Sequence, residues 1–236
     1  MRGEISSGAF DKRQPYDWYV DPVWCAYQLG AALDGFAAEK AAGLGIWDPA
    51  CGMGNTLQWP VAFGLQTFGS DIVDRFDWEP YGPDIGGHRP VWFSGDFLEL
   101  PRPALPCSIV SNPPYSYRKG SGGYAGMLIS EAFARRALEV TAKRVCLLLP
   151  VKWLASQARY RLFTDHPPLA VLHLTQRPSM PPGDRMNEMG NRAFRGGMID
   201  YCWIVWDVTR TVRPGETRTV WLPPIGTAIA PIEGIA

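Results

Sequence analysis

The stretch "GLGIWDPACGMG" (residues 43–54) combines a short apolar run with a turn that holds two glycines, Gly52 and Gly54. The apolar run ends at Asp48, which predicts a short buried strand with an acidic residue at its carboxyl end. The two glycines permit backbone conformations with positive φ and let a ligand approach the main chain closely. Ligands of doubly wound sheets bind at this end of the strands. The stretch therefore predicts both a fold class and a binding edge.

The rest of the chain alternates between strand-like and helix-like segments. Predicted strands are "QTFGSDIV" (66–73), "VWFSGDFLEL" (91–100), "CSIVSNPPY" (107–115), "KRVCLLLPVKWL" (143–154), "LAVLHLT" (169–175) and "MIDYCWIVWDVT" (198–209). The clearest helical patterns are "DPVWCAYQLGAALDGFAAEKA" (21–41), with Asp21 as its predicted N-cap, and "YAGMLISEAFARRALEVTA" (124–142). This alternation predicts an α/β fold, a doubly wound Rossmann-like sheet that is mostly parallel with a C-terminal antiparallel hairpin.

The length of 236 residues fits one large α/β domain with small appendages. We expect an N-terminal arm at 1–17, the domain itself at 18–210, and a C-terminal strap at 211–236. The end of the strap, "PPIGTAIAPIEGIA", is low in charge and has no periodicity, so we expect it to be irregular.

The five cysteines are an odd number and include no CxxC pair, which argues against a disulfide framework or a zinc site. We therefore expect no metal and a reducing, cytoplasmic location. The longest apolar runs are far too short to span a bilayer, and we expect no membrane contact.

The net charge is zero, but the charges are unevenly distributed. Residues 1–115 carry seven Lys or Arg and fourteen Asp or Glu, whereas residues 116–161 carry nine and two. A basic block directly after the Asn-Pro-Pro-Tyr turn suits a polyanionic substrate. The alternative interpretation is a solvated helix face.

Three predicted strands end at an acidic residue, in the order Asp48, Asp71 and Asp96. The turn after Asp48 lacks the GxGxxG pattern and a Lys-Ser/Thr pair, so a carboxylate there suits an amine better than a pyrophosphate. Asp71, about twenty residues further on, fits an acceptor for ribose hydroxyls. Asp96 is placed to accept from an adenine amino group, with Phe97 beside the ring. Each acid alone is typical of a turn or cap, but the ordered series favours a nucleoside ligand.

Three motifs carry a resemblance to a known family. "WDPACGMGNTL" (47–57) resembles the S-adenosylmethionine-binding motif of DNA adenine-N6 methyltransferases, whose pattern is Asp-Pro-Ala/Phe-Cys-Gly-x-Gly. "SNPPY" (111–115) is similar to their catalytic Asp/Asn-Pro-Pro-Tyr/Phe motif. "YVDPVWCAYQL" (19–29) resembles the Tyr-x-x-Pro element that closes over the methionine end of the cofactor. Their order is like that of the gamma class, and the resemblance covers residues 16–207.

The resemblance implies S-adenosylmethionine as the cofactor and assigns a role to each matched residue. Tyr19 and Pro22 would flank the methionine moiety, Asp71 would hold the ribose, and Asp96 with Phe97 would hold the adenine. The residues implied to contact the cofactor amine and carboxylate are Asp48, Ala50, Cys51, Gly52 and Gly54.

The turn Asn112-Pro113-Pro114-Tyr115 suits methyl transfer to an exocyclic amino group, which is a poor nucleophile because its lone pair is delocalised. Two acceptors on its N–H bonds make the nitrogen more tetrahedral. The Asn112 side-chain carbonyl and the Pro113 backbone carbonyl can act as these two acceptors, and the Pro-Pro step stiffens the backbone that carries them. Tyr115 offers a ring for base stacking, worth roughly 1–3 kcal/mol.

A base inside a duplex cannot reach such a pocket, so we expect DNA either with a flipped adenine or single-stranded. Two loops are candidate substrate contacts: 116–123 and 176–197. Their basic residues are Arg118, Lys119, Arg177, Arg185, Arg192 and Arg195.

Only 29 residues follow Asp207 in this sequence, so we expect no separate region like the long C-terminal target-reading region of gamma-class enzymes. This departure implies a short target, relaxed specificity, or an oligomer in which a second subunit helps.

Three alternatives stay open. Asn-Pro-Pro-Tyr also occurs in RNA adenine-N6 methyltransferases and in enzymes that methylate the side-chain amide of protein glutamine, because each substrate presents a planar, deactivated NH₂. A catalytically idle S-adenosylmethionine-binding partner protein is the third alternative.

Overall fold

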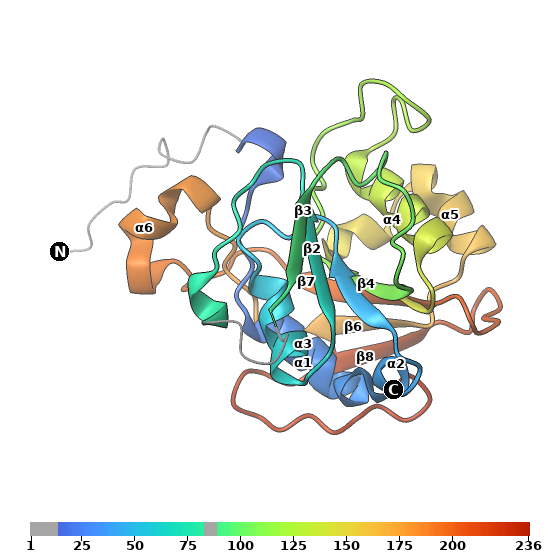
Figure 1. Ribbon diagram of the computed structural model, residues 1–236. Coiled ribbons are helices and arrows are strands. Elements are labelled where there is room, and N and C mark those ends of the chain that lie inside the picture. The colour runs from blue at the N-terminus through green and yellow to red at the C-terminus, as the bar shows by residue number, and fades with distance from the viewer. Residues whose placement is uncertain (1–13, 83–88) are drawn as a thin grey trace.

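The computed structural model describes residues 14–82 and 89–236, and Figure 1 shows them folded around one twisted sheet. The strand order is β3-β2-β1-β4-β5-β7-β6-β8. The strands are β1 (Gly45–Asp48), β2 (Thr67–Asp71), β3 (Val91–Ser94), β4 (Cys107–Ser111), β5 (Arg144–Pro150), β6 (Ala170–Leu174), β7 (Tyr201–Asp207) and β8 (Arg218–Leu222). This order confirms the predicted doubly wound α/β class.

The first five strands run parallel, and β7 is antiparallel to both of its neighbours, β5 and β6. The predicted C-terminal antiparallel hairpin is therefore confirmed as β6 and β7. The expected strap at 211–236 includes β8, which pairs in parallel with β6 and which the sequence pattern did not predict.

Helices cover both faces of the sheet (Figure 1). One face carries α1 (Trp24–Ala32), α2 (Ala37–Ala41) and α3 (Gln58–Ala62), and the apolar side chains of α1 and α3 share one core cluster with residues of the strands. The other face carries α4 (Ile129–Val140) and α5 (Tyr160–Asp165) and has its own cluster. The short helix α6 (Met186–Met189) lies in the loop between β6 and β7. Strands β1, β4, β5 and β7 are buried along their whole length, as both-face coverage requires.

The start of α1 differs from the sequence prediction. The helix begins at Trp24, and its N-cap position is Val23, without a side-chain cap. The expectation that Asp21 caps this helix was wrong, because the Asp21 carboxylate points across the fold and accepts hydrogen bonds from Thr56 and Asn112 instead.

A buried ion network lies at the end of the sheet opposite the predicted binding edge. The Arg144 guanidinium is 2.7 Å from the Glu39 carboxylate and 3.9 Å from Asp207, and both partners are almost fully buried. Arg144 also donates to the backbone carbonyl of Ile235, and Ser108 donates to Glu39. The network ties α2, β4, β5 and the C-terminal tail together.

In the part of the chain that the structure describes, no helix combines the length and the apolar character needed to cross a bilayer.

Candidate active site

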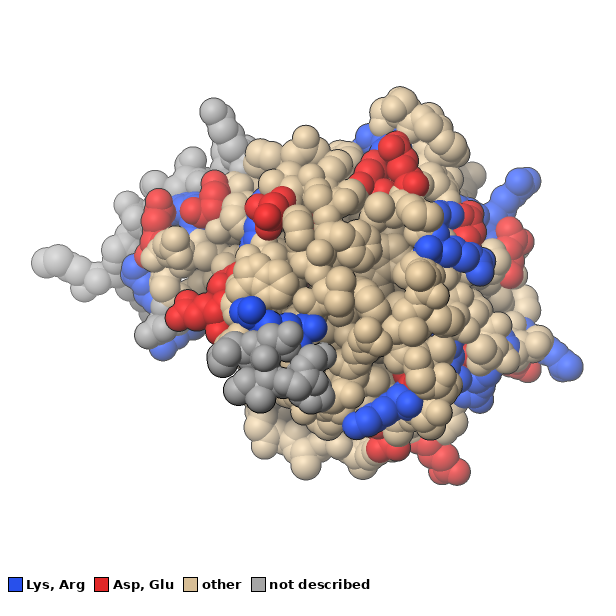
Figure 2. Space-filling view, viewed as in Figure 1, with Lys and Arg blue, Asp and Glu red and all other residues tan. Residues whose placement is uncertain are grey.

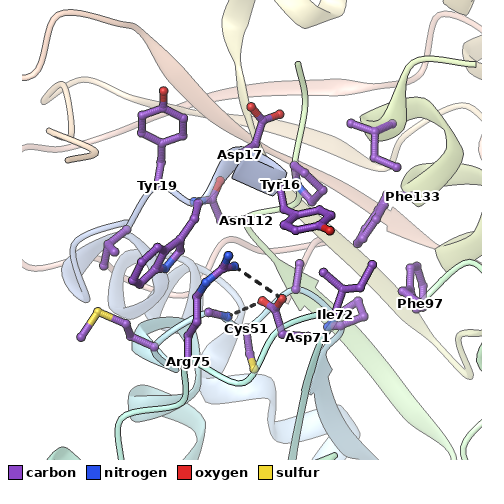
Figure 3. Close-up of a pocket in the computed structure, with 18 of the residues that line it drawn as sticks. Tyr16, Asp17, Tyr19, Cys51, Asp71, Ile72, Arg75, Phe97, Asn112 and Phe133 are labelled. Atoms are coloured by element: carbon purple, nitrogen blue, oxygen red, sulfur yellow. Dashed lines mark hydrogen bonds and ion pairs between the residues drawn. The ribbon is translucent and has the colours of Figure 1, made fainter. Parts of the chain in front are cut away.

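A cavity of about 180 Å³ lies at the carboxyl ends of β1 to β4, where the sequence predicts the binding edge. Figure 3 shows the Asp71 carboxylate between the Arg75 side chain and the Cys51 turn, with the Phe97 and Phe133 rings at one side. Of the predicted site residues, those that line this cavity are Tyr19, Ala50, Cys51, Gly52, Asp71, Asp96, Phe97, Asn112, Pro114 and Lys119. Asp71 at the end of β2, Asp96 after β3 and Asn112 after β4 therefore line the same cavity.

The segment Tyr16–Asp21 forms one wall of the cavity. Tyr16 and Asp17 both adopt left-handed backbone conformations, with φ of 55° and 54°, which non-glycine residues rarely adopt. The Asp17 carboxylate holds them in place, since it accepts hydrogen bonds from the backbone N–H groups of Tyr115, at 3.1 Å, and Ser116, at 2.6 Å. These two hydrogen bonds join the segment 16–21 to the residues at the end of the Asn-Pro-Pro-Tyr turn.

Asp71 is fixed in the cavity by the glycine turn. Its carboxylate accepts from the Gly52 backbone N–H at 2.9 Å and from the Val73 N–H at 3.2 Å, and Arg75 lies 3.9 Å away. Gly52 has a φ of 50°, so the left-handed conformation expected of this glycine is present. Burial raises the pKa of Asp71, and the hydrogen bonds from the turn oppose that rise.

Asp48 does not line the cavity. It is buried beneath the turn, where its carboxyl group accepts from the Ser111 hydroxyl at 2.6 Å and from the Ala50 N–H at 3.1 Å. Burial raises the pKa of Asp48 to about 8, because the surroundings supply too few donors to offset the loss of water. At neutral pH the group is therefore largely protonated, and it serves the local structure of the turn.

This raised pKa predicts a pH-dependent stability. A group whose pKa is higher in the folded state stabilises the fold below its unfolded pKa and loses that contribution as the pH rises through the folded value. Between pH 6.5 and 8 we expect the free energy of unfolding to fall by up to about 1.4 kcal/mol per pH unit from this group. Urea unfolding of the protein and of Asp48→Asn across this range tests it. An equally steep fall in the variant would contradict the assignment.

Asp96 and Phe97 lie at the cavity but already have protein partners. The Asp96 carboxylate forms an ion pair with Lys119 and accepts from the Leu98 N–H at 3.0 Å. Phe97 is 2% exposed and packs edge-on against Trp47, with ring centroids 5.2 Å apart. Both residues are thus positioned beside the cavity through contacts that the sequence pattern alone did not predict.

Asn112 follows the last residue of β4 and lines the cavity. Its Nδ2 donates to the Asp21 carboxylate at 3.3 Å, and its Oδ1 is buried without a hydrogen-bond partner among residues 14–82 and 89–236. Burying an acceptor without a partner costs about 1–3 kcal/mol, so this oxygen marks a place where a ligand donor would be stabilised. The adjacent Pro114 lines the cavity too.

The Tyr115 ring packs away from this space. Its hydroxyl lies 2.8 Å from the Tyr201 hydroxyl, and the ring contacts the apolar clusters of both sheet faces. The exposed rings that do line the cavity are Tyr16 and Tyr117. Pro22, Gly54 and Pro113 do not line the cavity either. At Gly54 a Cβ atom would lie 2.8 Å from the Phe76 ring, so a larger residue would clash there.

The loop 176–197 packs against the N-terminal wall of the cavity. The Val20 N–H donates to the Pro181 carbonyl, and the Gly183 N–H donates to the Trp18 carbonyl, both at 3.0 Å. Met180 approaches Asn112, with its sulfur 4.0 Å from Nδ2. The loop is therefore part of the same site, although none of its arginines lines the cavity.

The predicted substrate-binding cations differ in their surroundings. Lys119 pairs with Asp96, Arg177 with Asp200 at 2.6 Å, and Arg185 with Glu188 at 3.2 Å. Arg118 donates to the Gly126 carbonyl, while Arg192 and Arg195 are exposed. On the face shown in Figure 2, acidic and basic side chains alternate around a largely uncharged centre. Within the basic block at 116–161, ion pairs are formed by Lys119, Arg135, Arg136, Lys143 and Arg144.

Sequence reasoning missed several residues of the cavity wall. Asp17 and Asp21 act through partners more than 90 positions away, and no local pattern indicates such contacts. Ile72 and Arg75 had a usable signal, because they lie one and four positions after Asp71, the residue predicted to hold a ribose.

The comparisons with known proteins place the fold. No family model and no curated protein matches the sequence. A Listeria monocytogenes protein described as a class I S-adenosylmethionine-dependent methyltransferase is similar in structure, with a TM-score of 0.60, 16% identity, and coverage of 86% of this chain and 64% of that one. The structure of the type ISP restriction-modification enzyme LlaBIII bound to DNA is also similar, with a TM-score of 0.57 and 12% identity. The match covers 86% of this chain and 20% of that one.

A Pyrococcus horikoshii protein described as an RNA methyltransferase gives a TM-score of 0.50 and 16% identity, with coverage of 78% of this chain and 80% of that one. The chain thus spans under two thirds of the first two neighbours. At these identities the likeness concerns the fold. The eight-stranded sheet with its reversed strand β7 has the Rossmann-like architecture of class I methyltransferases.

Proposed function

We propose that this protein transfers a methyl group from S-adenosylmethionine to the N6 amino group of adenine in DNA. The observation that carries the proposal is the buried Oδ1 of Asn112, which accepts no hydrogen bond from any residue that the structure describes and belongs to a residue lining the same cavity as Asp71. It is an acceptor without a donor, at the position where the chemistry needs an acceptor for an amino N–H.

The charge of the cavity fits this cofactor. Among the described residues, the carboxylates of Asp17, Asp21, Asp71 and Asp96 line it, together with the cations of Arg75 and Lys119. A ligand that carries a sulfonium and an ammonium group suits such a lining. Bound S-adenosylmethionine would supply an electrophilic methyl group.

Each part of the cavity then has a proposed task. Asp71 holds the ribose hydroxyls, and the turn Ala50–Gly52 holds the methionine end together with Tyr19. Asp96 and Phe97 border the adenine of the cofactor. Asn112 and the Pro113 carbonyl accept from the target amino group. Positioning of donor and acceptor supplies most of the rate, about 7–11 kcal/mol in favourable cases.

The target adenine must leave its stack to reach Asn112. Tyr16 and Tyr117, both exposed at the cavity, are the rings that an extruded base would meet. Stacking on Tyr115 stays a prediction that requires its ring to leave Tyr201. Arg118, Lys119 and the arginines of 176–197 are proposed phosphate contacts. To bind a phosphate, Lys119, Arg177 and Arg185 would each exchange a carboxylate partner.

A single assay separates this proposal from its alternatives. We expect labelled methyl groups from S-adenosylmethionine to appear in adenine of duplex or single-stranded DNA. Label in RNA alone, or in protein glutamine alone, would replace the DNA assignment with that substrate. Binding of the cofactor without label in any acceptor would identify an idle binding protein.

Cofactor binding gives a second prediction. Asp71→Ala should weaken the affinity for S-adenosylhomocysteine about 10- to 100-fold, because hydrogen bonds to a charged group contribute about 1.5–3 kcal/mol. Asp74→Ala is the matched control, since Asp74 is exposed three residues away. Calorimetric titration measures both, and equal affinities would contradict the role of Asp71.

A further inference from the structure

Asp21 connects three segments of the cavity wall. Its carboxylate accepts from the Thr56 hydroxyl and from the Asn112 side-chain amide, both at 3.3 Å. Its backbone carbonyl accepts from Asn55 Nδ2 at 2.8 Å. The segment before α1, the helical turn after the glycines and the end of β4 therefore meet at this one buried residue, which is 7% exposed.

The contact with Asp21 determines which end of the Asn112 amide faces it. An ionised carboxylate is only an acceptor, and the asparagine side chain has a donor end and an acceptor end. The NH₂ end therefore faces Asp21, and the carbonyl oxygen is turned toward a side where no described protein group donates to it. The reversed amide would place two acceptors against each other and a donor where the reaction needs an acceptor.

We propose that Asp21 is a positioning residue, which holds the Asn112 side chain with its carbonyl oxygen presented to the amino group of the substrate. This inference rests on the proposed function for its catalytic meaning. The orientation itself follows from the contacts of Asp21 and is measurable without any turnover.

The inference implies a pH dependence. Burial raises the pKa of Asp21 to about 6, an effect that the hydrogen bonds from Asn112 and Thr56 only partly offset. As the pH falls through this value the carboxyl group gains a proton, becomes a donor, and no longer selects the NH₂ end of Asn112. The NH₂ end of Asn112 should therefore face Asp21 above pH 6, and this preference should be lost below pH 6.

The other titratable groups that interact with Asp21 come from four elements: Asp48 on β1, Cys25 on α1, Tyr201 on β7 and Tyr81 in the loop before β3. Burial raises the pKa of each of them. The pKa of Asp48, at about 8, places its titration in a separate and higher window. The thiol and the two phenols stay neutral near pH 6, since the shifts move them further from ionisation.

The orientation is tested by nuclear magnetic resonance on the ¹⁵N-labelled full chain. The Asn112 side-chain amide signals are identified by their loss in Asn112→Ala. We expect them to shift with a midpoint near pH 6 in the wild-type protein and in the control Asp165→Asn, an exposed site, but not in Asp21→Asn. Amide signals that do not move between pH 5 and 7 in the wild-type protein would overturn the inference, whether or not the protein transfers methyl groups.

Kinetics test the catalytic consequence. Asp21→Asn should lower kcat on the order of 100-fold, as misplaced reacting groups do, while the affinity for S-adenosylhomocysteine changes much less. In the wild-type protein, kcat should decrease as the pH drops from 6 to lower values. In Asp21→Asn, kcat should not show this decrease at acid pH. A variant with wild-type kcat and an unchanged decrease at acid pH would overturn the positioning role. If the Asn112 amide signals shift near pH 6 but the protein methylates no acceptor, the proposed function is refuted, whereas the orientation of Asn112 by Asp21 is supported.

Discussion

Asn112→Ala should lower kcat for methyl transfer about 100- to 1,000-fold, the usual loss when one preorganised polar group that acts on the transition state is removed. The variant retains Pro113 and Pro114, so the stiff turn stays, but the acceptor for one N–H of the target amine is gone. The affinity for S-adenosylhomocysteine should remain close to that of the wild-type protein, because cofactor contacts are assigned to Asp71 and the glycine turn. Steady-state kinetics and calorimetry together measure the two effects.

Gln157→Ala is a control for loss of an amide side chain, since Gln157 is exposed and lies outside the cavity. It should leave kcat unchanged. If Asn112→Ala instead lost cofactor affinity while its kcat persisted at saturation, the roles given to β4 and to the turn after β1 would be reversed.

Glu39→Ala should lower the free energy of unfolding by about 3–5 kcal/mol, the typical cost of removing one partner of a buried ion pair. Of the described acidic residues, the loss leaves Arg144 with Asp207, whose Oδ2 is 3.9 Å from the Arg144 Nε. Asp207 is shared with Lys143. The uncompensated guanidinium, more than the missing attraction, destabilises the fold. Urea unfolding monitored by tryptophan fluorescence measures the difference.

Two comparisons sharpen this prediction. Glu188→Ala breaks the exposed pair with Arg185 and should cost at most about 1 kcal/mol. The double variant Glu39→Leu with Arg144→Met should be more stable than Glu39→Ala, because apolar replacements remove the buried charge altogether. A double variant that is less stable than Glu39→Ala would show that the hydrogen bond from Arg144 to Ile235 matters more than the ion pair.

The fold and the position of the site were predictable because they depend on local patterns. Apolar runs that end at Asp48, Asp71 and Asp96 mark consecutive strand ends, and parallel strands bring such ends to one edge. Asn112 was identified by the two prolines that follow it. Strand β8, with the sequence RTVWL, escaped prediction because it lies at the sheet edge with only its last residue buried, so it lacks the apolar run that marks the buried strands.

The details of the site were not predictable, because they depend on contacts between distant residues. Nothing near Asp48 indicates that Ser111, 63 positions away, draws its carboxyl group under the turn. Nothing near Tyr115 indicates that Tyr201 holds its hydroxyl. Asp17 lies at the end of the predicted N-terminal arm and Asp21 at the start of a predicted helix, and neither position indicates the contact with the residues that follow β4.

The place of β7 in the sheet has a consequence for how the chain is made. This strand is the seventh to be synthesised, yet it lies between β5 and β6 and supplies the hydrogen-bonded neighbour of each. A ribosome-bound chain that stops before residue 201 therefore holds two apolar strands with open edges and nothing to join them. Such edges are the kind that nascent-chain chaperones shield from aggregation. We expect truncated chains ending before β7 to aggregate, and those extending past Asp207 to become protease-resistant.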